Sequence, residues 1–124
     1  MYQMLFITLG GAMGTLARYG VQLILAPASI RFPYGTLLVN VSGCLAIGFL
    51  HAQFMHRPSI RPEYQLAVLV GFLGGYTTFS SFGLEAVGLM RNGHYARAGV
   101  YVGVSNLVGI ACVMIGAMLG RIRG

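Results

Sequence analysis

The sequence contains very few charged side chains. Only 8% of its 124 residues are charged, whereas a soluble domain carries about 25%. So little polar surface excludes a water-soluble monomer. The hydrophobic fraction is 56%, and the 19 glycines suit closely packed transmembrane helices. The composition therefore places the chain in a lipid bilayer.

Lysine and tryptophan are both absent, and the only acidic residues are Glu63 and Glu85. The eight basic residues are all arginine and give a net charge of +6, but they occur singly and mostly bracket apolar segments. This pattern is typical of residues that anchor the ends of membrane spans at the lipid headgroups. We therefore do not expect nucleic acid as a partner.

Cysteine is scarce as well. Cys44 and Cys112 lie in different apolar runs, without the short spacing of a disulfide or metal pair, and we interpret them as small packing residues. The first apolar run has no basic region ahead of it and no clear small-residue cleavage site, so no removable signal peptide is expected.

Four apolar segments are long enough to cross a bilayer, which takes about 20 residues. They run approximately over 4–26, 34–55, 64–90 and 98–119. We therefore predict an all-α membrane protein of four transmembrane helices, with a single integral-membrane domain over 1–124. In the first segment, Gly10 and Gly14 form a GxxxG pair that favours close contact between helices.

The third segment carries residues that weaken a helix in its middle. Gly74 and Gly75 are adjacent, and the hydroxyls of Thr77 and Thr78 can satisfy backbone groups that a break would free. We predict that this helix is broken in mid-membrane at the glycine pair. The residues that follow include Phe79, Ser80, Ser81, Phe82 and Glu85. Polar groups in a membrane segment indicate a functional site.

The arginines are almost evenly divided between the two sides of a four-span chain. One side carries Arg57, Arg61, Arg121 and Arg123, and the other carries Arg31, Arg91 and Arg97, with Arg18 nearer to it. The imbalance of basic residues in short loops sets the orientation of a membrane protein. A chain without that imbalance can insert both ways, so we hypothesise a dual-topology, antiparallel homodimer.

The sequence shows no enzymatic constellation. His51, His56 and His94 lie at span ends or in loops, with no acid at triad or ligand spacing, and no P-loop lysine exists. A small dual-topology, proton-coupled exporter is an alternative, because Glu85 could titrate within the membrane. The position of Glu85 near the end of its span, the lack of an acid in the first span and the absence of tryptophan count against this alternative.

Neutral hydrogen-bond donors dominate the polar residues at membrane depth. They are Thr36, Asn40, Thr77, Thr78, Ser80, Ser81, Tyr101, Ser105 and Asn106. Such donors can replace the hydration shell of a small anion, which favours an ion channel. Phe79 and Phe82 share one helical face, and the positive edge of a benzene ring can face an anion. Packing is the alternative interpretation of this aromatic pair.

Three stretches of the chain carry a resemblance to a known family. They are residues 10–14 followed by Arg18 and Tyr19, residues 33–40 with Gly43, and residues 71–82. In this order the chain resembles the Fluc (CrcB) family of fluoride channels along nearly its whole length. The resemblance implies a dual-topology homodimer in the bacterial cytoplasmic (inner) membrane. Its two pores, each lined by both subunits, would export fluoride by passive electrodiffusion.

The resemblance also implies roles for individual residues. The ring edges of Phe79 and Phe82 would meet fluoride, and Asn40 would donate its side-chain amide to the ion. Arg18 would make the vestibule attractive to anions, or would anchor a helix end. The other positions implied along the ion pathway are Thr36, Ser80, Ser81, Glu85, Tyr101 and Ser105.

A sodium ion is the cofactor that the resemblance implies. It would be structural, not transported, and would lie at the dimer interface. On this sequence its ligands would be the backbone carbonyls of Gly74 and Thr77, in agreement with the general ability of broken helices to offer oxygens to a hard cation.

Overall fold

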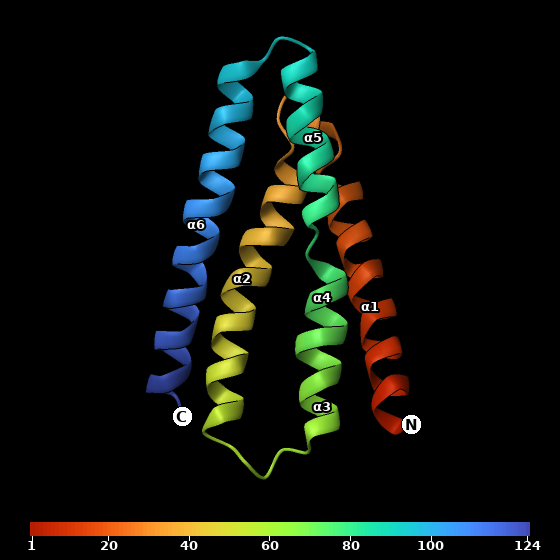
Figure 1. Ribbon diagram of the computed structural model, residues 1–124, viewed down its shortest axis with the longest axis vertical. Helices are drawn as coiled ribbons and strands as arrows, with labels where there is room; N and C mark the ends of the chain where they lie inside the picture. Colours follow the sequence, from red (N-terminus) through yellow and green to blue (C-terminus); the bar gives the residue numbers. More distant parts are fainter.

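The computed structural model describes all 124 residues, and every regular element in it is helical (Figure 1). The helices are α1 (Tyr2–Leu25), α2 (Tyr34–Met55), α3 (Pro62–Leu66), α4 (Leu73–Tyr76), α5 (Phe79–Arg91) and α6 (Tyr95–Ile122). A 3-10 turn, Pro27–Ser29, follows α1, and a π-helical turn, Ala67–Phe72, joins α3 to α4. The π-helical turn is not predicted from the sequence.

These helices cover the four predicted spans, and the chain is a multi-pass membrane protein. Three helical segments are long and apolar enough to cross a membrane, namely Tyr34–Met55, Pro62–Arg91 and Tyr95–Ile122. Helix α1 is long enough, at 24 residues, but is less apolar than these three, so its crossing stays a prediction. Both termini and the α2–α3 connection lie at one end of the bundle (Figure 1).

Helix α1 packs against the first half of the third segment, backbone to backbone. A Cβ atom on Gly14 would overlap the carbonyl group of Phe72, and one on Gly75 would lie 2.6 Å from the carbonyl oxygen of Gly11. A Cβ on Gly10 would likewise overlap the carbonyl oxygen of Ala67. The predicted GxxxG contact is therefore confirmed, because only glycine allows helices to approach this closely.

Helices α2 and α6 form a second close pair. A Cβ atom on Gly48 of α2 would overlap the carbonyl oxygen of Val113, and one on Gly116 of α6 would overlap that of Leu45. Near the end of the pair, the buried side chain of Gln53 donates from Nε2 to the carbonyl oxygen of Gly120 at 2.6 Å. This hydrogen bond satisfies a buried amide that would otherwise be costly in an apolar bundle.

The third segment leaves the helical conformation at Thr77 and Thr78, where the backbone is extended (φ/ψ −86°/158° and −149°/123°). The predicted position of the break, at Gly74 and Gly75, is wrong, since both glycines are helical within α4. Gly75 is needed instead for the close approach of α1 to α4. The chain leaves the helix here because a side chain of α2 takes over the backbone hydrogen bonding of Thr78, as described below.

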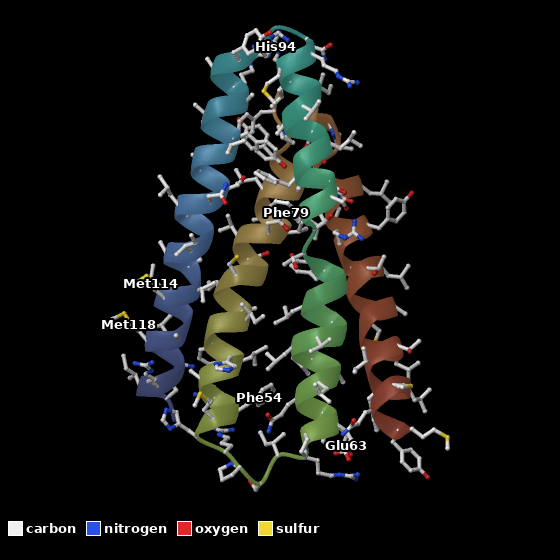
Figure 2. All side chains as sticks on the ribbon, in the orientation of Figure 1. Phe54, Glu63, Phe79, His94, Met114 and Met118 are labelled. Atoms are coloured by element: carbon white, nitrogen blue, oxygen red, sulfur yellow. The ribbon has the colours of Figure 1, made fainter.

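Helix α5 packs on α6 through large side chains. Phe82, Ala86 and Tyr101 form a buried cluster, and Phe32, Leu37 and Leu89 pack against it. Figure 2 shows the labelled Phe79 between the two ends of the bundle, which His94 and Glu63 mark. The interruption before α5 therefore lies well inside the bundle.

Candidate ion-binding site

Asn40 of α2 holds the extended backbone at Thr78. Its Nδ2 donates to the carbonyl oxygen of Thr78 at 2.9 Å, and the N–H of Thr78 donates to its Oδ1 at 2.8 Å. The carboxamide thus replaces both helical partners of one residue, as a neighbouring strand would. A side-chain amide has two N–H groups, and the second N–H of Asn40 donates to no protein group. Asn40 therefore stabilises the interruption and keeps one donor free.

Only one of the two threonine hydroxyls satisfies a backbone group that the interruption frees. The N–H of Ser81 donates to Thr78 Oγ1 at 3.2 Å, as predicted, and this bond makes Thr78 the N-cap of α5. Thr77 Oγ1 donates to the carbonyl oxygen of Leu73 at 2.9 Å, but that carbonyl already accepts the helical N–H of Thr77 at 3.0 Å. The prediction is therefore confirmed for Thr78 and wrong for Thr77.

Two backbone carbonyls at the interruption lack their helical donors. The N–H of Thr78, which would donate to the carbonyl of Gly74 in a continuous helix, donates to Asn40 instead. The carbonyl oxygen of Thr77 accepts no hydrogen bond. These are the two carbonyls that the family resemblance implies as ligands of a sodium ion. No group of three or more His, Cys, Asp or Glu side chains is placed to hold a metal ion.

A hollow of about 340 Å³ lies beside the interruption, and we call it the phenylalanine hollow. Six of the residues predicted for the site line it: Asn40, Gly74, Thr77, Phe79, Phe82 and Ser105. The rings of Phe79 and Phe82 are 5.7 Å apart between centroids and inclined by 41°. The hydroxyl of Ser105 is buried and has no hydrogen-bond partner. No acidic side chain lines this hollow.

Glu85 belongs to a separate hollow of about 490 Å³, which we call the carboxylate hollow. Thr36 and Ser81 line it as well, together with Gln22 of α1. Thr36 Oγ1 donates to Glu85 Oε1 at 2.7 Å, and Gln22 Nε2 donates to Thr36 Oγ1 at 3.3 Å. Gln22 was not predicted as a site residue, although a lone amide inside an apolar first span was an available signal.

Tyr101 connects the two hollows. Its side chain is fully buried, and its ring centroid lies 5.1 Å from that of Phe82. Its hydroxyl donates to Glu85 Oε2 at 3.1 Å. One continuous series of contacts therefore runs from the interruption toward the α5–α6 end of the bundle, through Phe79, Phe82, Tyr101 and Glu85.

Arg18 and Ser80 line neither of these hollows. Arg18 Nε donates to the carbonyl oxygen of Gly75 at 3.0 Å, which ties α1 to the last turn of α4. Ser80 is exposed, and its Oγ lies 3.4 Å from Thr78 Oγ1. Tyr101 lines neither hollow as well, but unlike Arg18 and Ser80 it contacts a lining residue of each, Phe82 and Glu85.

Comparison with known proteins identifies the family. The family described as CrcB-like protein, Camphor Resistance (CrcB), matches residues 5–117. Three similar proteins, each named "Fluoride-specific ion channel FluC", come from Trichormus variabilis, Nitratidesulfovibrio vulgaris and Solibacter usitatus. Their identities to this chain are 43%, 41% and 45% over 95%, 98% and 94% of it, and the matches cover 88%, 99% and 97% of the relatives. The chain therefore belongs to the CrcB family.

Proposed function

We propose that this protein is a fluoride channel that exports the ion from the bacterial cytoplasm by passive electrodiffusion across the inner membrane. The observation that carries the proposal is the phenylalanine hollow, in which two aromatic rings meet neutral hydrogen-bond donors and no carboxylate. Such a lining suits a small anion. The names of the relatives support fluoride as that anion. A channel breaks no covalent bond, so no catalytic residue is proposed.

Fluoride would meet three kinds of donor in the phenylalanine hollow. The free N–H of Asn40 and the unpaired hydroxyl of Ser105 can both donate to an anion. A buried hydroxyl without a partner costs about 1–3 kcal/mol, and an ion or a water molecule would remove that cost. The positive ring edges of Phe79 and Phe82 would complete the contacts.

Two copies of the chain would form the working unit, as an antiparallel, dual-topology homodimer with two pores. Phe79 supports this proposal, because its side chain is 82% exposed although it lines the hollow. An ion site whose wall includes an exposed aromatic ring is open on one side, and a second copy of the chain would cover it. The even division of the arginines between the two sides would allow opposite insertion of the two copies.

The third helix would be broken in mid-membrane, and a structural sodium ion would lie at this break. The donor set fits a hard cation, because Gly74 offers a carbonyl without its helical donor and Thr77 offers one without any hydrogen bond. Unwound backbone carbonyls are known ligands of sodium in membrane proteins. Bound there, the ion would neutralise the carbonyl dipoles and join the two copies.

Fluoride efflux from liposomes tests the proposal. Vesicles that contain the protein and fluoride should release it when a potassium ionophore balances charge, and vesicles loaded with chloride should retain it. Equal release of both anions would contradict selectivity. Release that depends on a proton gradient would favour the proton-coupled exporter, for which Glu85 is the only carboxylate in either hollow.

The sodium proposal needs its own measurement. Dimers purified in sodium should dissociate or lose fluoride flux after exhaustive exchange into a large organic cation, and returning sodium should restore both. Unchanged flux and assembly after exchange would remove sodium from the proposal and leave the fluoride pathway intact.

A further inference from the structure

The two cysteines, 68 positions apart in the chain, lie at the same helix interface. Cys44 of α2 faces α6, because its sulfur lies 3.5 Å from the position that a Cβ atom on Gly109 would occupy. Both thiols are free and half-buried. The interface around them is tight, since Gly48 and Gly116 bring the two backbones into contact.

Cys112 lies on the stripe of α6 that faces α2. It follows Gly109 by three residues and precedes Gly116 by four, and residues at these spacings share one helical face. Gly109 faces the sulfur of Cys44, and Gly116 faces the backbone of Leu45. Cβ atoms three positions apart on a helix are separated by about 5–6 Å. Cys112 is therefore within side-chain reach of Cys44.

One of the two cysteines also lines the phenylalanine hollow. Cys44 follows Gly43 and lies one helical turn beyond Asn40, and all three residues line that hollow. Cys112 does not line it. The pair therefore reaches from the helix interface to the wall of the candidate ion pathway.

We propose that Cys44 and Cys112 form a two-thiolate site for a soft divalent cation that prefers linear coordination, such as Hg²⁺. Thiolates are the ligands that soft metals prefer. Binding follows Hg²⁺ + 2 RSH → Hg(SR)₂ + 2 H⁺, so both protons leave and no electron is transferred. The product is neutral, which matters because a net charge is costly in an apolar interior. A monovalent cation would leave a net negative charge instead.

Occupation of this site should stop the proposed ion flux. The bound metal would draw the Cys44 side chain into a fixed position between α2 and α6, beside Asn40 at the wall of the phenylalanine hollow. The expected loss of ion flux rests on the proposed function, whereas the metal site itself does not. The experiment therefore measures binding and flux separately.

Binding is measured on the reduced, purified protein with Hg²⁺ alone as the probe. Titration should give one Hg²⁺ per chain, a near-ultraviolet charge-transfer band and release of two protons. Each of the variants C44S and C112S keeps one thiol and should lose the metal to glutathione at a concentration at least ~100-fold lower, since two linked ligands gain a factor of about 10²–10⁴ over one. The double variant should not bind.

Two binding results would overturn the site: two Hg²⁺ per chain, or single variants that hold the metal as tightly as the parent chain.

Flux is then measured in glutathione-buffered Hg²⁺. Fluoride efflux should fall at least ~10-fold in the parent chain and stay unchanged in C112S. If the protein binds one Hg²⁺ per chain and fluoride efflux is undiminished, the metal site does not lie beside the ion pathway. Full binding in a protein that carries no fluoride would support the site and contradict the proposed function.

Discussion

The two halves of the third segment, on either side of Thr77 and Thr78, are held in place by different means. Helix α4 packs on α1 through glycines whose missing side chains let the two backbones touch. Helix α5 packs on α6 through the large side chains of Phe82 and Tyr101 and through one hydrogen bond, from Tyr101 to Glu85. Backbone contact fixes where the segment runs, and side-chain contact builds the site.

This difference separates stability from function within one segment. A glycine contact has no tolerance for added volume, because interiors are close-packed and the neighbour at each position is backbone. Each polar or aromatic contact of α5 contributes less to the free energy of unfolding. Together these contacts determine which groups line the two hollows. Substitutions in the two halves should therefore fail in different ways.

The largest effect is expected for Gly14→Ala in α1. The new Cβ atom would overlap the carbonyl group of Phe72, so the helices must separate. Overpacking of this kind costs about 1–3 kcal/mol or more. Thermal unfolding in detergent, followed by size-exclusion chromatography, should show loss of the folded species at much lower temperature. Gly20→Ala on the same helix is the matched control, because nothing lies within 4 Å of that position. Equal stability of the two variants would contradict backbone packing.

Asn40→Ala should give the next largest effect. It leaves the N–H and the carbonyl of Thr78 without their partner. An unsatisfied buried group costs about 1–3 kcal/mol, and since both bonds are only part-buried, each loss lies at the low end of this range. We expect lower thermal stability together with loss of fluoride flux. Gln65→Ala is the control, since the amide of Gln65 donates only to the carbonyl oxygen of Ile60 and Gln65 lines neither hollow. Normal stability with lost flux would show that Asn40 serves the ion and not the interruption.

Phe82→Ile should reduce flux more than stability. Isoleucine fills most of the space but has no polarised ring edge, and losing about 1.4 kcal/mol of ion stabilisation slows passage about tenfold. Liposome efflux measures the change. Phe6→Ile is the control, because Phe6 forms an aromatic contact with Tyr64 away from both hollows. If flux is undiminished in Phe82→Ile, the phenylalanine is a packing residue, which is the alternative that the sequence left open.

Thr36→Val should give the smallest effect. It removes one of the two hydrogen bonds to the Glu85 carboxylate, while Tyr101 keeps the other. A single hydrogen bond to a charged group is worth about 1.5–3 kcal/mol, and because this bond is only part-buried the loss lies toward the low end. Thermal stability should fall slightly. Thr8→Val is the control, since Thr8 bonds to Met4 of its own helix in an exposed position. A larger loss of stability than in Asn40→Ala would contradict the expected order of these two substitutions.

Much of the candidate site could be predicted from local sequence. The hydroxyl of Thr78 is expected to satisfy a backbone group that the interruption frees, and it does, because capping acts over three or four residues. The pairing of Phe79 with Phe82 also follows from helical spacing. The glycine pair misled the prediction of the break, since glycine marks close approach as readily as it marks a weak helix.

Long-range contacts could not be predicted in this way. Nothing in the chain near Thr78 indicates that Asn40, 38 positions earlier, takes over its backbone hydrogen bonds. Gln22, 14 positions before Thr36, was missed for the same reason. The cysteines were interpreted as packing residues because their separation in sequence conceals their common interface.

The sequence by itself determined that this chain is a helical membrane protein, because too few polar residues are present for any other environment. It also determined which segments are apolar and which polar groups they carry. Only the tertiary structure decided where the third segment leaves the helix, and which polar groups share a hollow. The physical reason is that a backbone leaves a helix where another element satisfies its hydrogen bonds, and that element is known only once the helices are packed.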